Sequence, residues 1–167
     1  MPLAIVVLLG VAVVAFVVLG SRGPSGTASQ QMTSWVRAAN LGQAIGVLTD
    51  DDRNIARAVA AHQDTTAIHT VCAVLSNEAQ TANQNLPSPN VHVTDTLARA
   101  FSLEYDAAQA CYKGGAKGKQ LLAESARDRS KALTLLHRVL ADVRHITGQS
   151  VPTTTTTTPA GPTGTIL

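Results

Sequence analysis

The first twenty residues form an almost unbroken apolar run. From Leu3 to Leu19, seventeen consecutive residues are apolar or glycine, and Ser21 and Arg22 follow. This length is at the short end of what crosses a bilayer as a helix, and a soluble helix normally keeps a polar face, which this stretch lacks. The pattern predicts a transmembrane anchor over residues 1–21. A cleaved signal peptide is the alternative, because Gly26 and Ala28 offer small residues to a peptidase.

Two polar segments flank the remaining chain. Residues 22–31 are small and polar, which predicts a flexible linker. Residues 149–167 hold six consecutive threonines between Pro152 and Pro159, a composition that predicts a disordered tail. O-glycosylated stalks of secreted proteins share this composition, and an unmodified end is an equal alternative. The predicted folded domain therefore covers residues 32–148.

Within this domain, apolar residues recur every three or four positions and no alternating β pattern persists. The spacing predicts four helices, over residues 32–48, 49–84, 94–114 and 117–147. Pro87 and Pro89 separate the second from the third, and Gly148 ends the last. Asp50, Asp51 and Asp52 are interpreted as carboxylates at the N-terminus of the second helix. The prediction is all-α: an antiparallel four-helix bundle behind a transmembrane helix.

Two cysteines lie on the apolar faces of neighbouring predicted helices. The midpoint between Cys72 and Cys111 falls close to the proline loop at residues 86–90. Positions equidistant from the turn of an antiparallel hairpin face each other, so we predict a disulfide between them. Closing a loop of roughly 40 residues stabilises the fold by about 4 kcal/mol in the chain-entropy model. Two buried free thiols are the alternative.

The same region carries a resemblance to a group of proteins. The motifs are Cys72 in a long helix, the loop from Leu86 to Asn90, Thr94 opening the next helix, Cys111, and a Thr/Pro tail. This pattern resembles uncharacterised extracytoplasmic helical-bundle proteins of actinobacteria, over about residues 48–147. Asn90 stands where these proteins more often have an acidic residue. The resemblance implies membrane-anchored or secreted placement, and it implies no established activity.

Charge is unevenly distributed along a chain whose formal net charge is only +2. Eight acidic residues lie between positions 50 and 106, and eight basic residues lie between positions 113 and 144. The overall balance is too weak for a nucleic-acid partner, which neutralises phosphates with several Lys and Arg side chains. Attraction between helices is one interpretation of the asymmetry. The other is that Lys113, Lys117 and Lys119 form a basic patch facing anionic lipid or an envelope polymer.

No motif of nucleophilic, phosphate-binding or dinucleotide chemistry occurs, so we predict no enzyme and no cofactor. His62 and His69 are seven residues apart, and His137 and His145 are eight apart. Helical metal pairs normally use a spacing of three or four, so we predict no metal site. Glu104 lacks the Glu-x-x-His partner of di-iron bundles, which excludes that class.

The orientation signals conflict. Arg22 follows the apolar run, and by the positive-inside rule it places the domain in the cytoplasm. The cysteine pair and the threonine tail favour the outside, and we give these more weight. We expect a single-pass plasma-membrane protein whose extracytoplasmic domain binds a protein or envelope component; secretion after cleavage is the alternative. A small-ligand or metal-binding sensor that uses His62, His69 and a cavity between alanine-lined helices is the second functional prediction.

Overall fold

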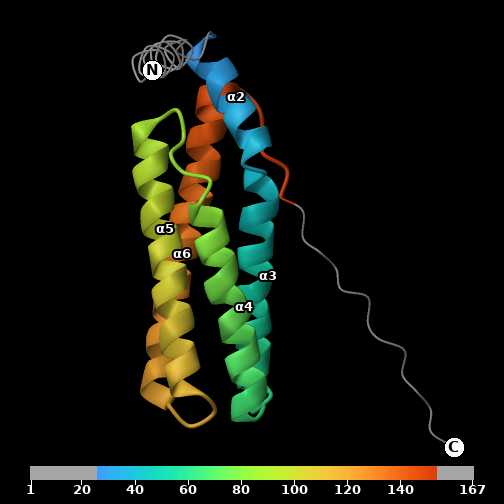
Figure 1. Cartoon of the computed structure of the whole chain (residues 1–167), viewed down its shortest axis with the longest axis vertical. Coiled ribbons are helices and arrows are strands. Elements are labelled where there is room, and N and C mark those ends of the chain that lie inside the picture. Colours follow the sequence, from blue (N-terminus) through green and yellow to red (C-terminus); the bar gives the residue numbers. More distant parts are fainter. Residues whose placement is uncertain (1–25, 154–167) are drawn as a thin grey trace, which may run out of the picture.

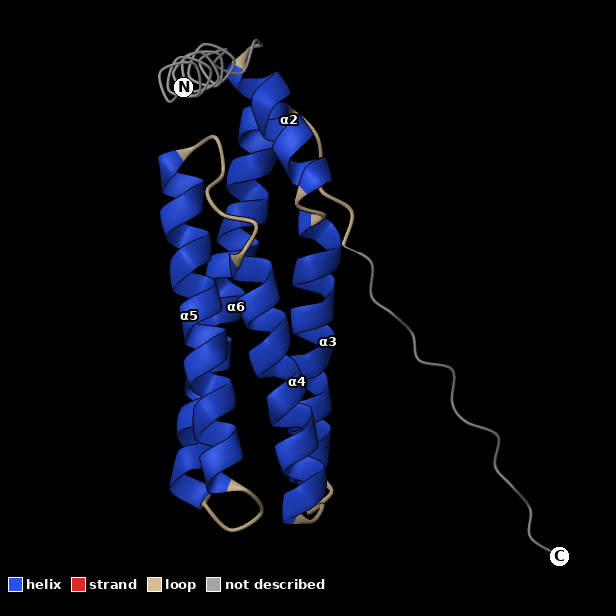
Figure 2. Cartoon of the chain, in the orientation of Figure 1, coloured by secondary structure: helices blue, strands red, loops and turns tan. Residues whose placement is uncertain are grey.

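A computed structural model describes residues 26–153, and within this range helices are joined by short loops (Figures 1 and 2). The five helices are α2 (Ala28–Ala38), α3 (Leu41–Ala60), α4 (Thr65–Asn83), α5 (Val91–Gly114) and α6 (Lys119–Thr147). No strand occurs among the described residues, and one disulfide joins Cys72 to Cys111. The all-α class and the disulfide are therefore confirmed.

The helices form an elongated bundle. α3, α4, α5 and α6 run alternately up and down beside one another, and the short α2 sits at one end (Figure 1). α5 packs extensively against both α4 and α6, whereas α3 and α6 touch only sparsely. The opposite end of the bundle carries the turn between α3 and α4 and the loop between α5 and α6 (Figure 1).

The core combines a few large aliphatic residues with many alanines. Fully buried large side chains come from every helix and include Met32, Leu48, Leu75, Leu97 and Leu136. Buried alanines on α4 and α5, such as Ala79 and Ala108, let the helix backbones approach closely. The three-to-four spacing in the sequence thus places the predicted apolar faces inside.

The predicted boundary between the first two helices is wrong. α3 continues to Ala60, so Asp50, Asp51 and Asp52 lie inside a helix and do not cap one. The chain turns at residues 61–64 instead, where His62 adopts a left-handed conformation with φ of 51°. Asp64 caps α4, because its carboxylate accepts a hydrogen bond from the Ala67 amide at 2.8 Å. Residues 61–64 include neither Gly nor Pro, so the usual sequence markers of a helix end are missing at this turn.

The predicted first helix, over residues 32–48, is also divided: α2 ends at Ala38 and α3 begins at Leu41, with Asn40 between them in a left-handed conformation. The remaining helix ends differ by smaller amounts. α2 begins at Ala28, inside the predicted linker, because Thr27 and Gln30 form a capping box. α5 begins at Val91, three residues before the predicted start at residue 94, because the Asn90 side chain caps it by accepting from the Val93 amide at 3.1 Å. α6 ends at Thr147 and Gly148 follows in a left-handed conformation, as predicted.

Among the described helices, none is long and apolar enough to cross a membrane. The predicted span at residues 1–21 lies outside the described residues, as does the tail from residue 154 onward. The described chain ends beside the α2 end of the bundle, where Val151 packs against the core.

Candidate functional site

The disulfide lies between α4 and α5. Cys72 and Cys111 are both fully buried, and their Cα atoms are 5.8 Å apart. This separation is within the ordinary range for a disulfide, so the two helices need no displacement to be bridged. The disulfide fixes the lengthwise position of α4 relative to α5, near the end of the bundle that lies away from α2.

An aromatic pair lies next to the disulfide. The rings of His69 on α4 and Tyr112 on α5 are stacked, with centroids 4.1 Å apart and planes inclined by 20°. Tyr112 is 46% exposed, which is unusual for a large apolar side chain in this protein. The Ala116 amide donates to the Thr65 hydroxyl at 3.3 Å and ties the α5–α6 loop to the start of α4.

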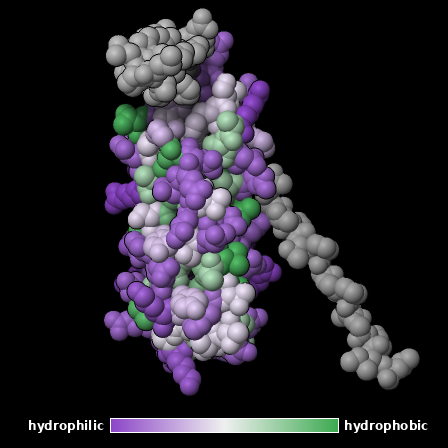
Figure 3. Space-filling view, viewed as in Figure 1, coloured by the Kyte–Doolittle hydropathy of each residue, from purple (hydrophilic) through white to green (hydrophobic). Residues whose placement is uncertain are grey.

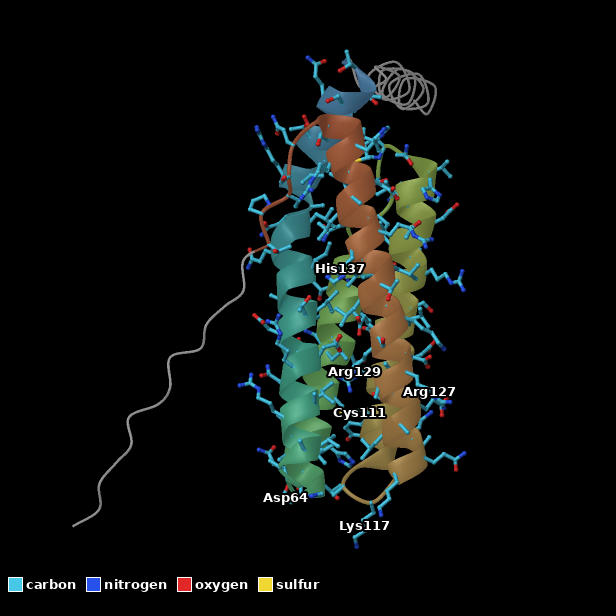
Figure 4. All side chains as sticks on the ribbon, turned by 180° about the vertical axis from the view of Figure 1, so that it is seen from behind. Asp64, Cys111, Lys117, Arg127, Arg129 and His137 are labelled. Carbon is cyan, nitrogen blue, oxygen red and sulfur yellow. A yellow bond between two sulfur atoms is a disulfide. The ribbon has the colours of Figure 1, made fainter. Side chains whose placement is uncertain are left out.

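Lys113, Lys117 and Lys119 surround this loop and are all exposed. Figure 4 shows Lys117 at the tip of the bundle, level with Asp64, and Figure 1 shows α2 at the other tip. Within the part of the chain that the structure describes, none of the three lysines forms an ion pair. We call these three lysines the distal basic end.

Two shallow hollows lie along α4 and α5 and share Gln80; we call them together the α4–α5 groove. The first hollow has a volume of about 270 Å³ and its lining includes Ser76, Asn77, Gln80, Gln109 and Tyr112. The Gln109 amide nitrogen and the Ser76 hydroxyl lie 3.3 Å apart across it. Gln80 also lines a second hollow of about 410 Å³ that is otherwise formed by Ala79, Asn83, Ala98, Phe101, Ser102 and Tyr105. Neither hollow is lined by a charged side chain, so both suit hydroxyl or amide groups better than ions.

The face that carries this groove has no large apolar patch. Figure 3 shows mostly hydrophilic groups with scattered hydrophobic ones on the side viewed in Figure 1. Among the described residues the exposed large hydrophobic side chains are Val74, Val91 and Tyr112. Val91 begins α5 and Tyr112 is near its end, so these two do not form one surface. A broad apolar protein interface is therefore not what this face presents.

A buried polar cluster lies in the middle of the bundle, between α3, α5 and α6. Its members are Asp51 and Asp52 of α3, Glu104 of α5, and Ser125 and Arg129 of α6. Arg129 Nη1 donates to the Asp52 carbonyl at 2.8 Å and is 3.6 Å from the Asp52 carboxylate. Figure 4 shows Arg129 in the lower half of the bundle, on the side of α6 that faces α3.

Most polar atoms of the cluster lack partners. Glu104 is 0% exposed, and neither of its carboxyl oxygens has a hydrogen-bond partner among the described residues. The same holds for the Ser125 hydroxyl and for Nε of Arg129. Buried polar groups in native proteins are normally hydrogen-bonded, so this concentration of unpartnered atoms marks an unusual place in the fold.

The surroundings raise the pKa of all three carboxyl groups, those of Asp51, Asp52 and Glu104. Burial, reinforced by repulsion from Asp52 and Asp51, raises the pKa of Glu104 to about 9, although Arg129 acts in the opposite direction. Burial and repulsion from Glu78 raise the pKa of Asp51 to about 6. Burial also raises the pKa of Asp52 to about 6, against the attraction of Arg129. At neutral pH, Glu104 is therefore protonated and the two aspartates are mostly ionised.

The histidines singled out in the sequence occupy separate surroundings. His62 lies in the turn before α4, whereas the ring of His69 stacks on Tyr112. His137 and His145 are exposed on α6. Within residues 26–153 no three His, Cys, Asp or Glu side chains are grouped so that they could hold a metal ion.

The buried polar cluster was not predicted from the sequence, in which Glu104 was considered only as a ligand of a di-iron site. The signal was present in part, because Phe101, Glu104, Ala108 and Cys111 recur at helical spacing and share one face of α5. The aspartates gave a false signal, since consecutive carboxylates near a predicted helix start fit a capping role.

Comparison of the chain with models of known protein families, with curated proteins and with solved structures finds no match.

Proposed function

We propose that this protein is a membrane-tethered, extracytoplasmic domain without enzymatic activity that binds a component of the cell envelope. The disulfide between Cys72 and Cys111 carries the proposal, because such bonds persist in oxidising compartments and are rare in the cytosol. The apolar run at residues 3–19 supplies the tether. The protein is then a single-pass plasma-membrane protein, or a secreted one if the run is cleaved.

The ligand that fits best is an anionic envelope polymer that carries phosphate or carboxylate groups. The distal basic end presents three exposed ammonium groups without ion pairs among the described residues. Half-exposed Tyr112 and the amide-lined groove beside it offer stacking and hydrogen bonds to a sugar or polyol backbone. An extended chain with charged groups and hydroxyls satisfies both features.

The shape of the bundle favours a polymer over the headgroups of the tethering membrane. The described chain starts at the α2 end, and the distal basic end lies at the other tip (Figure 1). The 29 residues of α6 span about 43 Å at 1.5 Å per residue. A bundle tethered at residue 26 therefore holds its lysines far from the surface to which it is attached.

Binding of the full-length protein in nanodiscs to poly(glycerol phosphate) tests this proposal. We expect replacement of Lys113, Lys117 and Lys119 by Gln to weaken binding about tenfold, since three surface charge contacts of a few tenths of a kcal/mol add to about 1.4 kcal/mol. A charge-matched control replaces Arg127, Arg138 and Arg144, which are exposed elsewhere on α6, by Gln. Equal weakening by both triple variants would contradict a site at the distal basic end.

Two further probes separate the ligand classes. Neutral dextran is expected to bind weakly or not at all, because it lacks the charges that the lysines recognise. Vesicles of phosphatidylglycerol, added to the same nanodisc preparation, test lipid as the ligand. Stronger binding to vesicles than to the polymer would overturn the choice of a polymer.

The second candidate function is a small-ligand sensor, and one feature favours it. The hollow of about 410 Å³ between α4 and α5 is lined by Ala79, Ala98, Phe101 and Tyr105 and has the size of a small-molecule site. The metal-binding form of this candidate uses His62 and His69. We expect zinc, copper and iron to leave the melting temperature of the full-length protein unchanged; a specific rise with one metal would revive it.

A further inference from the structure

We infer that the buried polar cluster is a proton-binding site: with Glu104 protonated the cluster holds α3 against α6, and ionisation of Glu104 loosens this seam. The inference is independent of the proposed function, since it concerns the core of the bundle and no surface ligand. Its members remain Asp51, Asp52, Glu104, Ser125 and Arg129.

Glu104 is buried in the core of the bundle. Its side chain is 0% exposed and neither carboxyl oxygen has a hydrogen-bond partner among the described residues. An ionised carboxylate without water or a partner carries a large desolvation cost, and such a group keeps its proton instead. The folded protein at neutral pH therefore holds a proton at Glu104 that the unfolded chain releases.

Charged side chains of neighbouring helices surround Glu104. α3 contributes Asp51 and Asp52, α6 contributes Arg129, and α4 contributes Glu78, which acts on Asp51. Arg129 is the single cation in this set, and its Nη1 is directed to Asp52. One guanidinium cannot neutralise three buried carboxylates, so the fully ionised cluster has an excess of two negative charges.

The raised pKa values of the three carboxyl groups set the direction in which folding stability changes with pH. In the folded state the pKa of Asp51 and of Asp52 is about 6 and that of Glu104 about 9, whereas free carboxyl groups titrate near pH 4. The folded state therefore binds more protons than the unfolded state between about pH 4 and pH 9, and its stability falls as pH rises through this range. Above about pH 7 the decline belongs to Glu104 alone.

The contact between α3 and α6 is where we expect the bundle to loosen when the cluster becomes charged. Charging the cluster favours the entry of water beside it, because repulsion and desolvation are both relieved by hydration. α3 and α6 touch only sparsely, whereas α5 packs extensively on both α4 and α6 and the disulfide joins it to α4. The contact between α3 and α6 is thus expected to open before the contacts of α5 with α4 and with α6.

Urea unfolding of the full-length protein in detergent, followed by the fluorescence of the single tryptophan Trp35, tests the inference. We expect the wild-type midpoint to fall between pH 7 and pH 9. In Glu104→Gln, which keeps the shape and cannot ionise, the midpoint should stay nearly constant over this interval. Glu124→Gln on the exposed face of α6 is the matched control and should follow the wild type. A wild-type midpoint that is constant or rises, or a Glu104→Gln variant that declines like the wild type, would overturn the inference.

Two measurements on the wild type keep the inference testable should Glu104→Gln fail to fold. Carbon-13 NMR of the Glu104 carboxyl should show a titration midpoint above pH 7, and a midpoint below pH 7 would refute a proton held there. Hydrogen exchange, corrected for its intrinsic pH dependence, should show that α3 and α6 lose protection before α4 and α5 as pH rises. Simultaneous loss of protection in all four helices would refute the assignment to the α3–α6 seam.

Discussion

The contact between α4 and α5 and the contact between α3 and α6 hold their helices together by opposite means. α4 and α5 are joined by a disulfide among small buried side chains such as Ala79 and Ala108. α3 and α6 are joined by Arg129 and Asp52, within a cluster whose polar atoms are largely without hydrogen-bond partners among the described residues. The first contact is covalent and closely packed, whereas the second is sparse and charged.

If the inference above holds, this difference makes one bundle responsive to two separate variables at two places. The α4–α5 contact depends on the redox state of its surroundings, because a disulfide is lost only by reduction. The α3–α6 contact is expected to weaken as pH rises, because the pKa of Asp52 is about 6 and that of Glu104 about 9. Each contact can therefore be weakened without a direct change in the other.

The largest expected effect is loss of the disulfide. Replacing Cys72 and Cys111 together by Ala should lower the free energy of unfolding by about 4 kcal/mol, because the 39-residue separation makes the released loop long. Urea unfolding at pH 7 measures this, and intact-mass analysis of unreduced wild-type protein verifies that the bond forms. A loss below about 1 kcal/mol would mean that the small side chains of α4 and α5 suffice without it.

The second effect is smaller and depends on pH. Arg129→Met should lower the free energy of unfolding by about 3 kcal/mol at pH 7, because it leaves the Asp52 carboxylate buried without its cation. At pH 5 the loss should be smaller, since the pKa of Asp52 is about 6 and the group is then mostly protonated. The measurement is urea unfolding at both pH values.

Arg53→Met is the matched control for that experiment. It breaks the exposed Arg53–Asp50 pair at 2.9 Å, and such surface pairs contribute less than about 0.5 kcal/mol. An equal loss for Arg129→Met at pH 5 and pH 7 would show that Asp52 does not change charge between them.

The smallest expected effect concerns Ser125. Its hydroxyl is buried without a hydrogen-bond partner among the described residues, so Ser125→Ala removes an unsatisfied polar group. We expect a change of less than about 1 kcal/mol, in the stabilising direction. A destabilisation above that size would indicate that the Ser125 hydroxyl is hydrogen-bonded to a bound water or to a carboxyl group of the cluster. Calorimetric unfolding measures the sign and size of the change.

Local features of the sequence determined the helical class, the apolar faces, the proline loop, the end of α6 and the cysteine pair. Each follows from neighbours a few residues apart, or from symmetry about one turn, as with Cys72 and Cys111. The three lysines of the distal basic end were grouped because they lie within seven positions of one another. Their location at the tip opposite α2 came only from the tertiary structure.

The buried polar cluster was decided by tertiary structure alone, and the reason is the turn at residues 61–64. His62 adopts its left-handed conformation without Gly or Pro nearby, so the sequence predicted a helix boundary some twelve residues too early. That error placed Asp51 and Asp52 at a solvated helix end. With the turn in its actual position, α3 continues past the aspartates and brings them level with Glu104 and Arg129. Which charges share a core depends on how helices align lengthwise, and that alignment is set by turns and packing, which no local pattern encodes.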